Sequence, residues 1–224
     1  MIMKLPLLIK VYIRLMRGWN RLTPEAQVLV KQFVKSQQKN GCYVNAGGKT
    51  DDYYTQFGVV LEAVFSPMKI ASLPVRQLTV KEALDKDTVY GYFFRFILDD
   101  LQFRRPKTLD VNVPEVLTTN AVCCILAMRD QMGEKKDMKL VEWLKERQDE
   151  TGGFYASEAA PVPDMLTTAV ALFTLRLVGE KAKSARNFID AHWMENGGFM
   201  PTIFDEYSDV EYVFYGLLAL GSNE

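Results

Sequence analysis

The chain has few of the residue types on which nucleophilic and metal chemistry most often depend. Its 224 residues contain one histidine, His192, and three cysteines, Cys42, Cys123 and Cys124. A serine or cysteine catalytic triad would have only His192 as its imidazole base. The odd number of cysteines, two of them adjacent in an apolar run, favours buried free thiols in a reducing compartment. We therefore expect a cytoplasmic protein, and no residue pattern indicates a cofactor.

The chain also lacks an excess of charge, long apolar runs and linkers. The chain carries 27 Lys and Arg against 28 Asp and Glu, a formal net charge of -1. Nucleic-acid binding needs a concentrated basic surface, so we expect no nucleic-acid partner. No long Pro/Gly/Ser tract separates domains. A chain of this length can bury one sizeable core, and we expect a single domain over residues 1–224.

The amino-terminal stretch leaves two interpretations open. Basic residues interrupt residues 1–19, which are therefore too short and too charged for a membrane span, and no small-residue site indicates signal-peptide cleavage. Within residues 1–22 a helix would place Lys10, Arg14, Arg17 and Arg21 opposite Leu8, Ile9, Tyr12, Ile13 and Met16. Such a helix can pack on the domain with snorkelling basic side chains, which we favour, or lie on an anionic membrane surface. The second interpretation predicts a membrane-peripheral protein that binds through residues 1–19.

The sequence repeats itself. Residues 143–154 align without a gap to residues 188–199, so that Gly152-Gly153-Phe154 matches Gly197-Gly198-Phe199. A third copy lies at 33–43 and ends at Tyr43 in place of the phenylalanine. The glycines allow positive φ and a tight exit from the preceding helix.

A second, nearly all-apolar helix follows each loop. Residues 163–172 align with 114–123, and the register continues into 209–218 and 52–61. By contrast, the helix over 139–148 is amphipathic. Alternating half-exposed and fully buried helices predict two layers, with the second helices inside and the first outside. Together with residues 74–85 and 88–103, which also look helical, the sequence predicts about ten helices in about five helical hairpins.

These repeats resemble a known family. The string Trp143-Leu144-x-x-x-Gln148-x-x-x-Gly152-x-Phe154 resembles the Gln-Trp (QW) repeat of squalene-hopene cyclases. The Gly-Gly-Phe loop followed by Asp164-x-x-Thr167 resembles the repeat of protein prenyltransferase β subunits. The resemblance covers most of the chain from about residue 24, and it implies an all-α fold, the α/α toroid.

Two catalytic motifs of that family are incomplete in this sequence. Protein prenyltransferases hold zinc with an Asp and a Cys two residues apart at an inner-helix start, and no such cysteine is present here. Squalene-hopene cyclases use an Asp-x-Asp-Asp acid, whereas here Thr50-Asp51-Asp52 lacks the first aspartate. We therefore predict no metal site.

Four acids recur at the expected starts of the inner helices, namely Asp52, Glu115, Asp164 and Asp209. A ring of carboxylates at a cavity mouth could hold a metal-diphosphate or act as acid and base. Capping of free N–H groups explains the repetition better, because every unit needs it. We assign these acids, with the loop glycines Gly152, Gly153, Gly197 and Gly198, to the structural repeat.

Two sets of residues remain as functional candidates. Asp99-Asp100-Leu-Gln-Phe103 is similar to the magnesium-binding motif of class I terpene synthases, so Asp99 and Asp100 are candidate catalytic residues. An ordinary solvated helix end is the alternative. The aromatics of the inner helices could line an apolar ligand site or simply fill the core. The ligand-binding candidates are Tyr53, Tyr54, Phe57, Tyr212, Phe214 and Tyr215.

Three functions follow as hypotheses. The first is a protein that binds an apolar, isoprenoid-like ligand in a prenyltransferase- or cyclase-like toroid. The second is a non-catalytic helical scaffold for a protein partner. The third is an active terpenoid cyclase or prenyl transferase that uses Asp99 and Asp100.

Overall fold

The computed structural model describes residues 4–45, 47–66 and 88–223. Within these ranges the chain forms nine helices and one short hairpin. The helices are α1 Leu7–Trp19, α2 Pro24–Ser36, α3 Asp52–Phe65, α4 Val89–Leu101, α5 Thr119–Met132, α6 Met138–Glu146, α7 Met165–Leu177, α8 Arg186–Ala191 and α9 Val210–Ser222. The strands are β1 Gln38–Lys39 and β2 Cys42–Tyr43, which pair antiparallel. The helix predicted over 74–85 lies outside the described residues.

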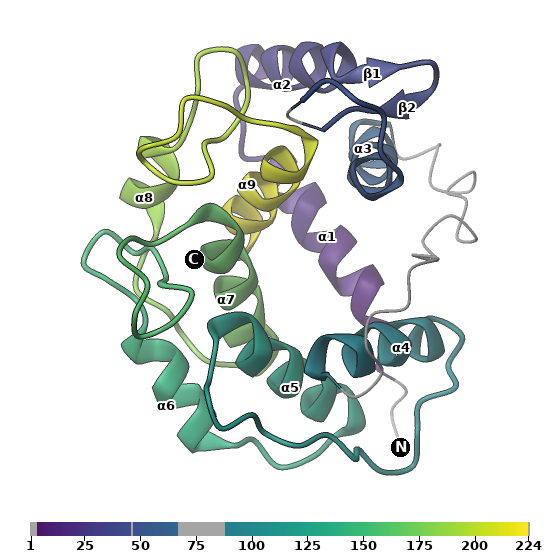
Figure 1. The fold of residues 1–224 in the computed structure, drawn as a ribbon, viewed down its shortest axis with the longest axis vertical. Helices are drawn as coiled ribbons and strands as arrows, with labels where there is room; N and C mark the ends of the chain where they lie inside the picture. The colour runs from purple at the N-terminus through teal and green to yellow at the C-terminus, as the bar shows by residue number, and fades with distance from the viewer. Residues whose placement is uncertain (1–3, 46, 67–87, 224) are drawn as a thin grey trace.

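The helices form a two-layered ring. Figure 1 shows α2, α6 and α8 on the outside and α3, α5, α7 and α9 inside them. Burial follows the same division, because 10 of the 14 residues of α5 and 9 of the 13 of α7 are buried, while the outer α6 buries only Leu140, Val141 and Leu144. The predicted all-α toroid with inner and outer helices is confirmed.

One unit lacks its outer helix. Three hairpins are complete in the described ranges, α2–α3, α6–α7 and α8–α9, but residues 102–118 before α5 contain no helix. Pro106 and Pro114 lie in this segment, and proline removes a backbone donor and disfavours helix in the residue before it. The expectation of about five regular hairpins is therefore not met on this side of the ring, where α4 packs directly on α5.

The same hydrogen bond joins loop to inner helix in all three complete hairpins. The backbone N–H of the loop aromatic donates to a hydroxyl near the start of the following helix. The pairs are Tyr43 to Thr55 at 3.0 Å, Phe154 to Thr168 at 2.8 Å, and Phe199 to Ser208 at 3.0 Å. This bond fixes the aromatic ring beneath the loop, where each of the three is at most 1% exposed.

The first glycine of each Gly-Gly loop touches the next unit. A Cβ on Gly152 would overlap the backbone of Ala185 at the start of α8, and a Cβ on Gly197 would lie 2.6 Å from the backbone nitrogen of Val30 in α2. Both glycines have positive φ, at 95° and 92°, which an L side chain rarely adopts. Because α2 belongs to the first unit and Gly197 to the last, the second contact closes this part of the ring.

The second glycine of each loop makes room for a side chain, from the next unit at Gly153 and from its own unit at Gly198. A Cβ on Gly153 would overlap the ring of Phe188, and one on Gly198 would lie 2.7 Å from Ser208 Oγ. The structural role predicted for the four loop glycines is therefore explained by close packing at each of them.

Two of the four predicted caps are observed. Asp164 accepts the N–H of Thr167 at 2.8 Å, and Asp209 accepts the N–H of Glu211 at 2.9 Å. These side chains satisfy N–H groups that the first helical turn leaves unbonded.

The other two predicted caps were wrong. Asp51, not Asp52, caps α3 by accepting the N–H of Tyr53 at 2.8 Å, while Asp52 is exposed in the first turn. The alignment of the first unit was therefore one residue out of register. At α5 the cap is Thr118, and Glu115 lies exposed in the non-helical segment before it.

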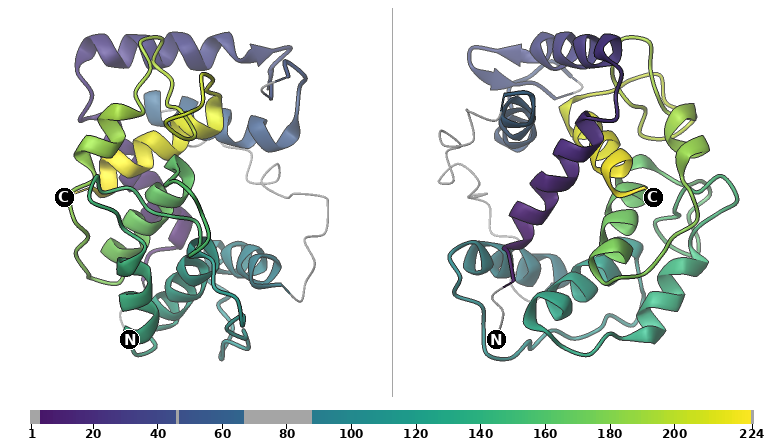
Figure 2. Two further views of the ribbon diagram at one scale, coloured as in Figure 1. Left: turned by 60° about the vertical axis from the view of Figure 1, so that its left-hand side comes forward. Right: turned by 180° about the vertical axis from the view of Figure 1, so that it is seen from behind.

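Helix α1 lies across one face of the ring. It is behind α9 in Figure 1 and in front of it in the right view of Figure 2. The two helices cross with backbones in contact, because a Cβ on Gly18 would overlap the carbonyl oxygen of Leu217 and one on Gly221 that of Arg14. In the structure this helix packs on α9.

The basic side chains of α1 bind within the molecule. Lys10 Nζ donates to Gln131 Oε1 at 2.7 Å, and Arg21 donates to the carbonyl oxygens of Leu220 and Asn223. Ile9 and Ile13 on the other side remain 38% exposed. Membrane contact through residues 1–19 stays a prediction.

In the part of the chain that the structure describes, every helix is too short or too polar to cross a membrane.

Replacing Gly221 by alanine tests the crossing of α1 and α9. Alanine is normally the better helix former, but here its Cβ would meet the carbonyl oxygen of Arg14, so we expect a loss of about 2 kcal/mol or more in the free energy of unfolding. Thermal denaturation should show a melting temperature lower by about 4 °C or more. The control is Gly47→Ala, whose Cβ would come no closer than 3.3 Å to another atom. Equal effects of the two changes would contradict the close crossing.

The cap of α3 can be tested with two adjacent aspartates. Asp51→Ala should lower the free energy of unfolding by about 1 kcal/mol, because it leaves the N–H of Tyr53 without its acceptor. Asp52→Ala removes only an exposed charge near the helix start, with an expected loss of about 0.3 kcal/mol. Urea denaturation of both variants would decide the register, and a larger loss for Asp52→Ala would restore the alignment expected from the sequence.

Candidate functional site

Five of the six aromatic residues predicted to bind a ligand are joined by ring contacts where α3 packs against α9, and the sixth, Tyr212, lies in the first turn of α9. The two helices are far apart in the sequence, and their first turns bring the rings into edge contact. Ring centroids are 5.1 Å apart for Tyr53 and Phe57, 5.1 Å for Phe57 and Phe214, and 5.4 Å for Phe214 and Tyr215. We call Tyr53, Tyr54, Phe57, Tyr212, Phe214 and Tyr215 the aromatic surface. Tyr53 is 45% exposed, while the other five are half-buried, so the surface is open to solvent at one edge.

A buried carboxylate lies against this surface. Glu211, in the first turn of α9, is 7% exposed and accepts the hydroxyl of Tyr53 at 2.6 Å. Burial raises the pKa of Glu211, the hydrogen bond from Tyr53 lowers it in part, and Asp209 raises it further. Our sequence reasoning missed Glu211. The signal was a single charge within the otherwise apolar segment that follows Asp209.

The surroundings of Glu211 are acidic. Burial is the main cause that raises the pKa of Asp209 and of Asp164, the caps of α9 and α7. Burial also raises the pKa of Tyr212 and of Tyr215, and in both cases the negative charge of Glu211 adds to it. The starts of α7 and α9 thus present carboxylates and tyrosine hydroxyls beside the aromatic surface. Such groups accept protons and bind donors, and they repel anions.

His192 is close to these acids but is buried in the core. Its Nδ1 lies 2.8 Å from the carbonyl oxygen of Phe188, and its ring stacks on that of Phe188 with centroids 4.0 Å apart. Burial lowers the pKa of His192, so the ring stays neutral at pH 7. With 3% of its surface exposed, it is a core residue rather than an accessible base.

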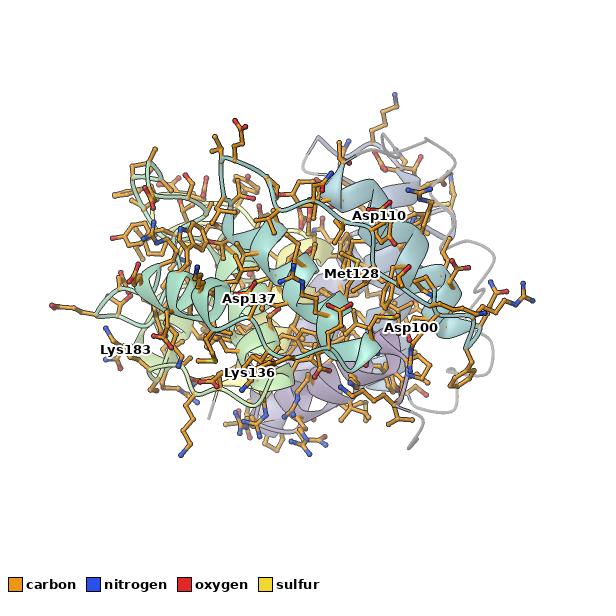
Figure 3. The ribbon with its side chains drawn as sticks, turned by 90° about the horizontal axis from the view of Figure 1, so that it is seen from below. Asp100, Asp110, Met128, Lys136, Asp137 and Lys183 are labelled. Atoms are coloured by element: carbon orange, nitrogen blue, oxygen red, sulfur yellow. The ribbon has the colours of Figure 1, made fainter. Side chains whose placement is uncertain are left out.

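Asp99 and Asp100 point to different environments. Asp100 is fully buried, and its Oδ1 accepts from Arg105 Nε. Its Oδ2 accepts the backbone N–H of Leu7 at 2.6 Å and Gln131 Nε2 at 3.0 Å. Arg105 donates in addition to the carbonyl oxygen of Lys4 at 2.6 Å. Asp100 therefore ties the end of α4 to the start of α1 and the end of α5 (Figure 3).

Asp99 is exposed on the outside of the same turn. Asp100 is next to Gln131 near the end of α5, whereas the aromatic surface lies at the starts of α3 and α9. The structure thus does not bring Asp99 and Asp100 to the aromatic surface, and their catalytic role stays a prediction.

The three cysteines are free thiols, and two of them are buried. These are Cys123 and Cys124, and burial raises the pKa of Cys123 to about 12. Cys42 is half-exposed, so the expectation of burial holds for two of the three.

No group of three or more His, Cys, Asp or Glu side chains within residues 4–45, 47–66 and 88–223 is arranged to hold a metal ion.

The contacts of Asp100 predict a large effect of removing its charge. Asp100→Asn leaves Arg105 without its buried carboxylate, and we expect a loss of about 3 kcal/mol or more in the free energy of unfolding. The matched change Asp99→Asn should cost less than about 0.5 kcal/mol, because that side chain is exposed. Chemical denaturation measures both, and equal small losses would show that Asp100 does not hold α1 in place.

Residues 115–221 match the family model described as the prenyltransferase alpha-alpha toroid domain. The matched segment contains α5 to α8 and all but the last residue of α9, which are the helices with the clearest loops and caps. No curated protein matches the chain. Over residues 115–221 the chain is therefore similar to the prenyltransferase alpha-alpha toroid domain, the family that its repeats resemble.

Proposed function

We propose that the chain binds an apolar, isoprenoid-like ligand against the aromatic surface. The observation that carries the proposal is the contact of five aromatic side chains from α3 and α9 in one partly exposed group, namely Tyr53, Tyr54, Phe57, Phe214 and Tyr215. Rings in a closed core would be fully buried, yet Tyr53 keeps 45% of its surface exposed. Exposed aromatic faces gain free energy when an apolar chain covers them.

The charges beside the aromatic surface restrict the ligand further. Glu211 and Asp209 are buried carboxylates at the start of α9. A diphosphate placed next to them would meet like charge at a site with little water to screen it. The part of the ligand that touches this surface is therefore an apolar chain, with a neutral or donor group near Glu211.

Any acid chemistry at this surface would fall to Glu211. It is the carboxylate that touches the aromatic surface, through the hydroxyl of Tyr53, and burial raises its pKa. Binding of the ligand requires no such chemistry, and the proposal stands on the surface alone.

A scaffold for a protein partner is the second candidate, favoured by one observation. The loop before α9 exposes Phe204 at 77%, Ile203 at 49% and Tyr207 at 47%. Exposed apolar side chains close together in one loop are typical of protein-protein contact sites.

Native mass spectrometry with a polyprenol and a prenyl diphosphate tests the first candidate. We expect uptake of one polyprenol per chain and weaker uptake of the diphosphate, because Glu211 and Asp209 oppose its charge. The double change Tyr53→Ala and Phe57→Ala should weaken polyprenol uptake about tenfold, since it removes two rings that the ligand would cover. Phe103→Ala, an exposed aromatic after α4, is the control and should leave uptake unchanged.

Two outcomes would contradict this assignment. The first is the absence of uptake of either compound, and the second is equal uptake by the double variant and the Phe103→Ala control. A purified partner whose binding is lost on Phe204→Ala, in a chain that takes up no polyprenol, would support the scaffold instead.

A further inference from the structure

The starts of α3, α9, α7, α5 and α4 meet at one end of the ring. A hydrogen bond joins each start to the next, or to the loop that leads to it. The bonds are Tyr53 Oη to Glu211 Oε1 at 2.6 Å, Met165 N to Pro201 O at 2.8 Å, Thr119 N to Ala156 O at 2.9 Å, and Tyr90 Oη with Thr118 Oγ1 at 2.9 Å. We call these starts and the loops before them the rim, namely residues 47–54, 88–90, 110–119, 155–164 and 201–211.

The rim exposes large apolar side chains in two of its loops. Before α5, Val116 is 80% exposed and Val113 is exposed as well. Before α9, Phe204, Ile203 and Tyr207 are exposed. Single exposed apolar residues are ordinary on a protein surface, whereas several on one face mark a contact site. The rim therefore offers apolar area to a partner.

The rim is also acidic, although the whole chain has a net charge of only -1. Lys49 is the one Lys or Arg in its segments. Arg147, from outside the rim, pairs with Glu158 at 3.0 Å. The exposed acids of the rim are Asp52, Asp110, Glu115, Glu158 and Glu206. The rim thus carries an excess of negative charge that the rest of the chain balances.

The acids and the apolar side chains lie in the same loops. Glu206 is next to Tyr207, and Glu115 is next to Val116. A partner that covers the apolar side chains must therefore bring cations to the carboxylates beside them. We propose that the rim docks a segment of a partner protein in which Lys or Arg residues alternate with apolar ones. Such docking gives the second candidate function a stated partner chemistry, and it does not depend on ligand uptake at the aromatic surface.

The charge of the rim disfavours other occupants. An anionic membrane or a nucleic acid would meet like charge. An uncharged lipid surface could cover Phe204 and Val116, but it would take the carboxylates of Glu206 and Glu115 out of water without a counter-ion. Two copies of the chain with their rims face to face would repel each other in the same way. A basic and apolar protein segment satisfies both kinds of side chain.

Fluorescence anisotropy of the full chain with labelled peptides tests the proposal. The probe is a peptide of about twelve residues that alternates lysine with leucine, a length that can span several anchor positions. We expect saturable binding that weakens about tenfold when the ionic strength rises from ~0.1 M to ~1 M, because salt screens exposed charges. Two control peptides, glutamate with leucine and lysine with serine, should bind at least tenfold more weakly, because each lacks one half of the complementarity.

Matched variants decide whether the peptide binds at the rim. Phe204→Ala should weaken binding about tenfold, and the double change Glu115→Gln and Glu206→Gln about fivefold. All three side chains are exposed, so the melting temperature should not change. The controls are Phe103→Ala and Asp99→Asn, an exposed aromatic and an exposed acid at the end of α4, which should leave the affinity unchanged.

Three results would overturn the proposal. They are the absence of saturable peptide binding, equal affinity for the lysine-leucine and glutamate-leucine peptides, and equal effects of the rim variants and their controls. Binding to phosphatidylcholine vesicles that is lost in Phe204→Ala would assign the rim to a lipid surface instead. Polyprenol uptake by the same chain is measured separately, so a failure of peptide binding is distinguished from a failure of the ligand site.

Discussion

The ring depends on places where two backbones touch with no side chain between them. At Gly152 and Gly197 a loop meets the backbone of the next outer helix, and at Gly18 and Gly221 α1 meets α9. Each contact has room for hydrogen only, so any larger residue would push neighbouring elements apart. The loop contact occurs in two of the three complete hairpins, at Gly152 and Gly197, and there it contributes to the rotation from one hairpin to the next. The curvature of the ring thus depends on the positions of these glycines as much as on the periodic spacing of apolar residues.

Repetition explains why the architecture could be predicted. A contact that every unit needs leaves the same residue at the same place, as in Gly152 and Gly197 or in the caps Asp164 and Asp209. The first unit shows the limit of this inference. Asp51 and Asp52 are both acids, so the alignment could not tell which of them accepts the N–H of Tyr53. Likewise the residue that caps α5 is Thr118 and not an acid. A search for a repeated acid therefore selected the nearby Glu115.

Features that occur once were not predictable. The position of Asp100 depends on Leu7 and Gln131, which lie far from it in the sequence. No local sequence pattern predicts contacts of this kind. Its environment differs from that of Asp99 because neighbouring residues of a helix point in different directions, here one into the core and the other to solvent. Glu211 was missed for the converse reason. A single acid in an apolar helix looks like a helix-start charge until the partner helix brings Tyr53 to it. The six aromatics were found because aromatic residues are frequent in both inner helices.

The inner helices separate two kinds of surface. Their starts carry aromatics and buried carboxylates, and the ends of α7 and α9 carry cations around a cavity. Tyr212 and Ser222 are ten residues apart on α9, a distance of about 15 Å at 1.5 Å per residue. The aromatic surface offers apolar side chains, while the cavity has both polar and apolar lining residues. A single ligand with an apolar chain and a phosphate head would have to reach both places, and the buried core fills the space between them. Because that core is closely packed, the two places are separate, and a single ligand does not span them.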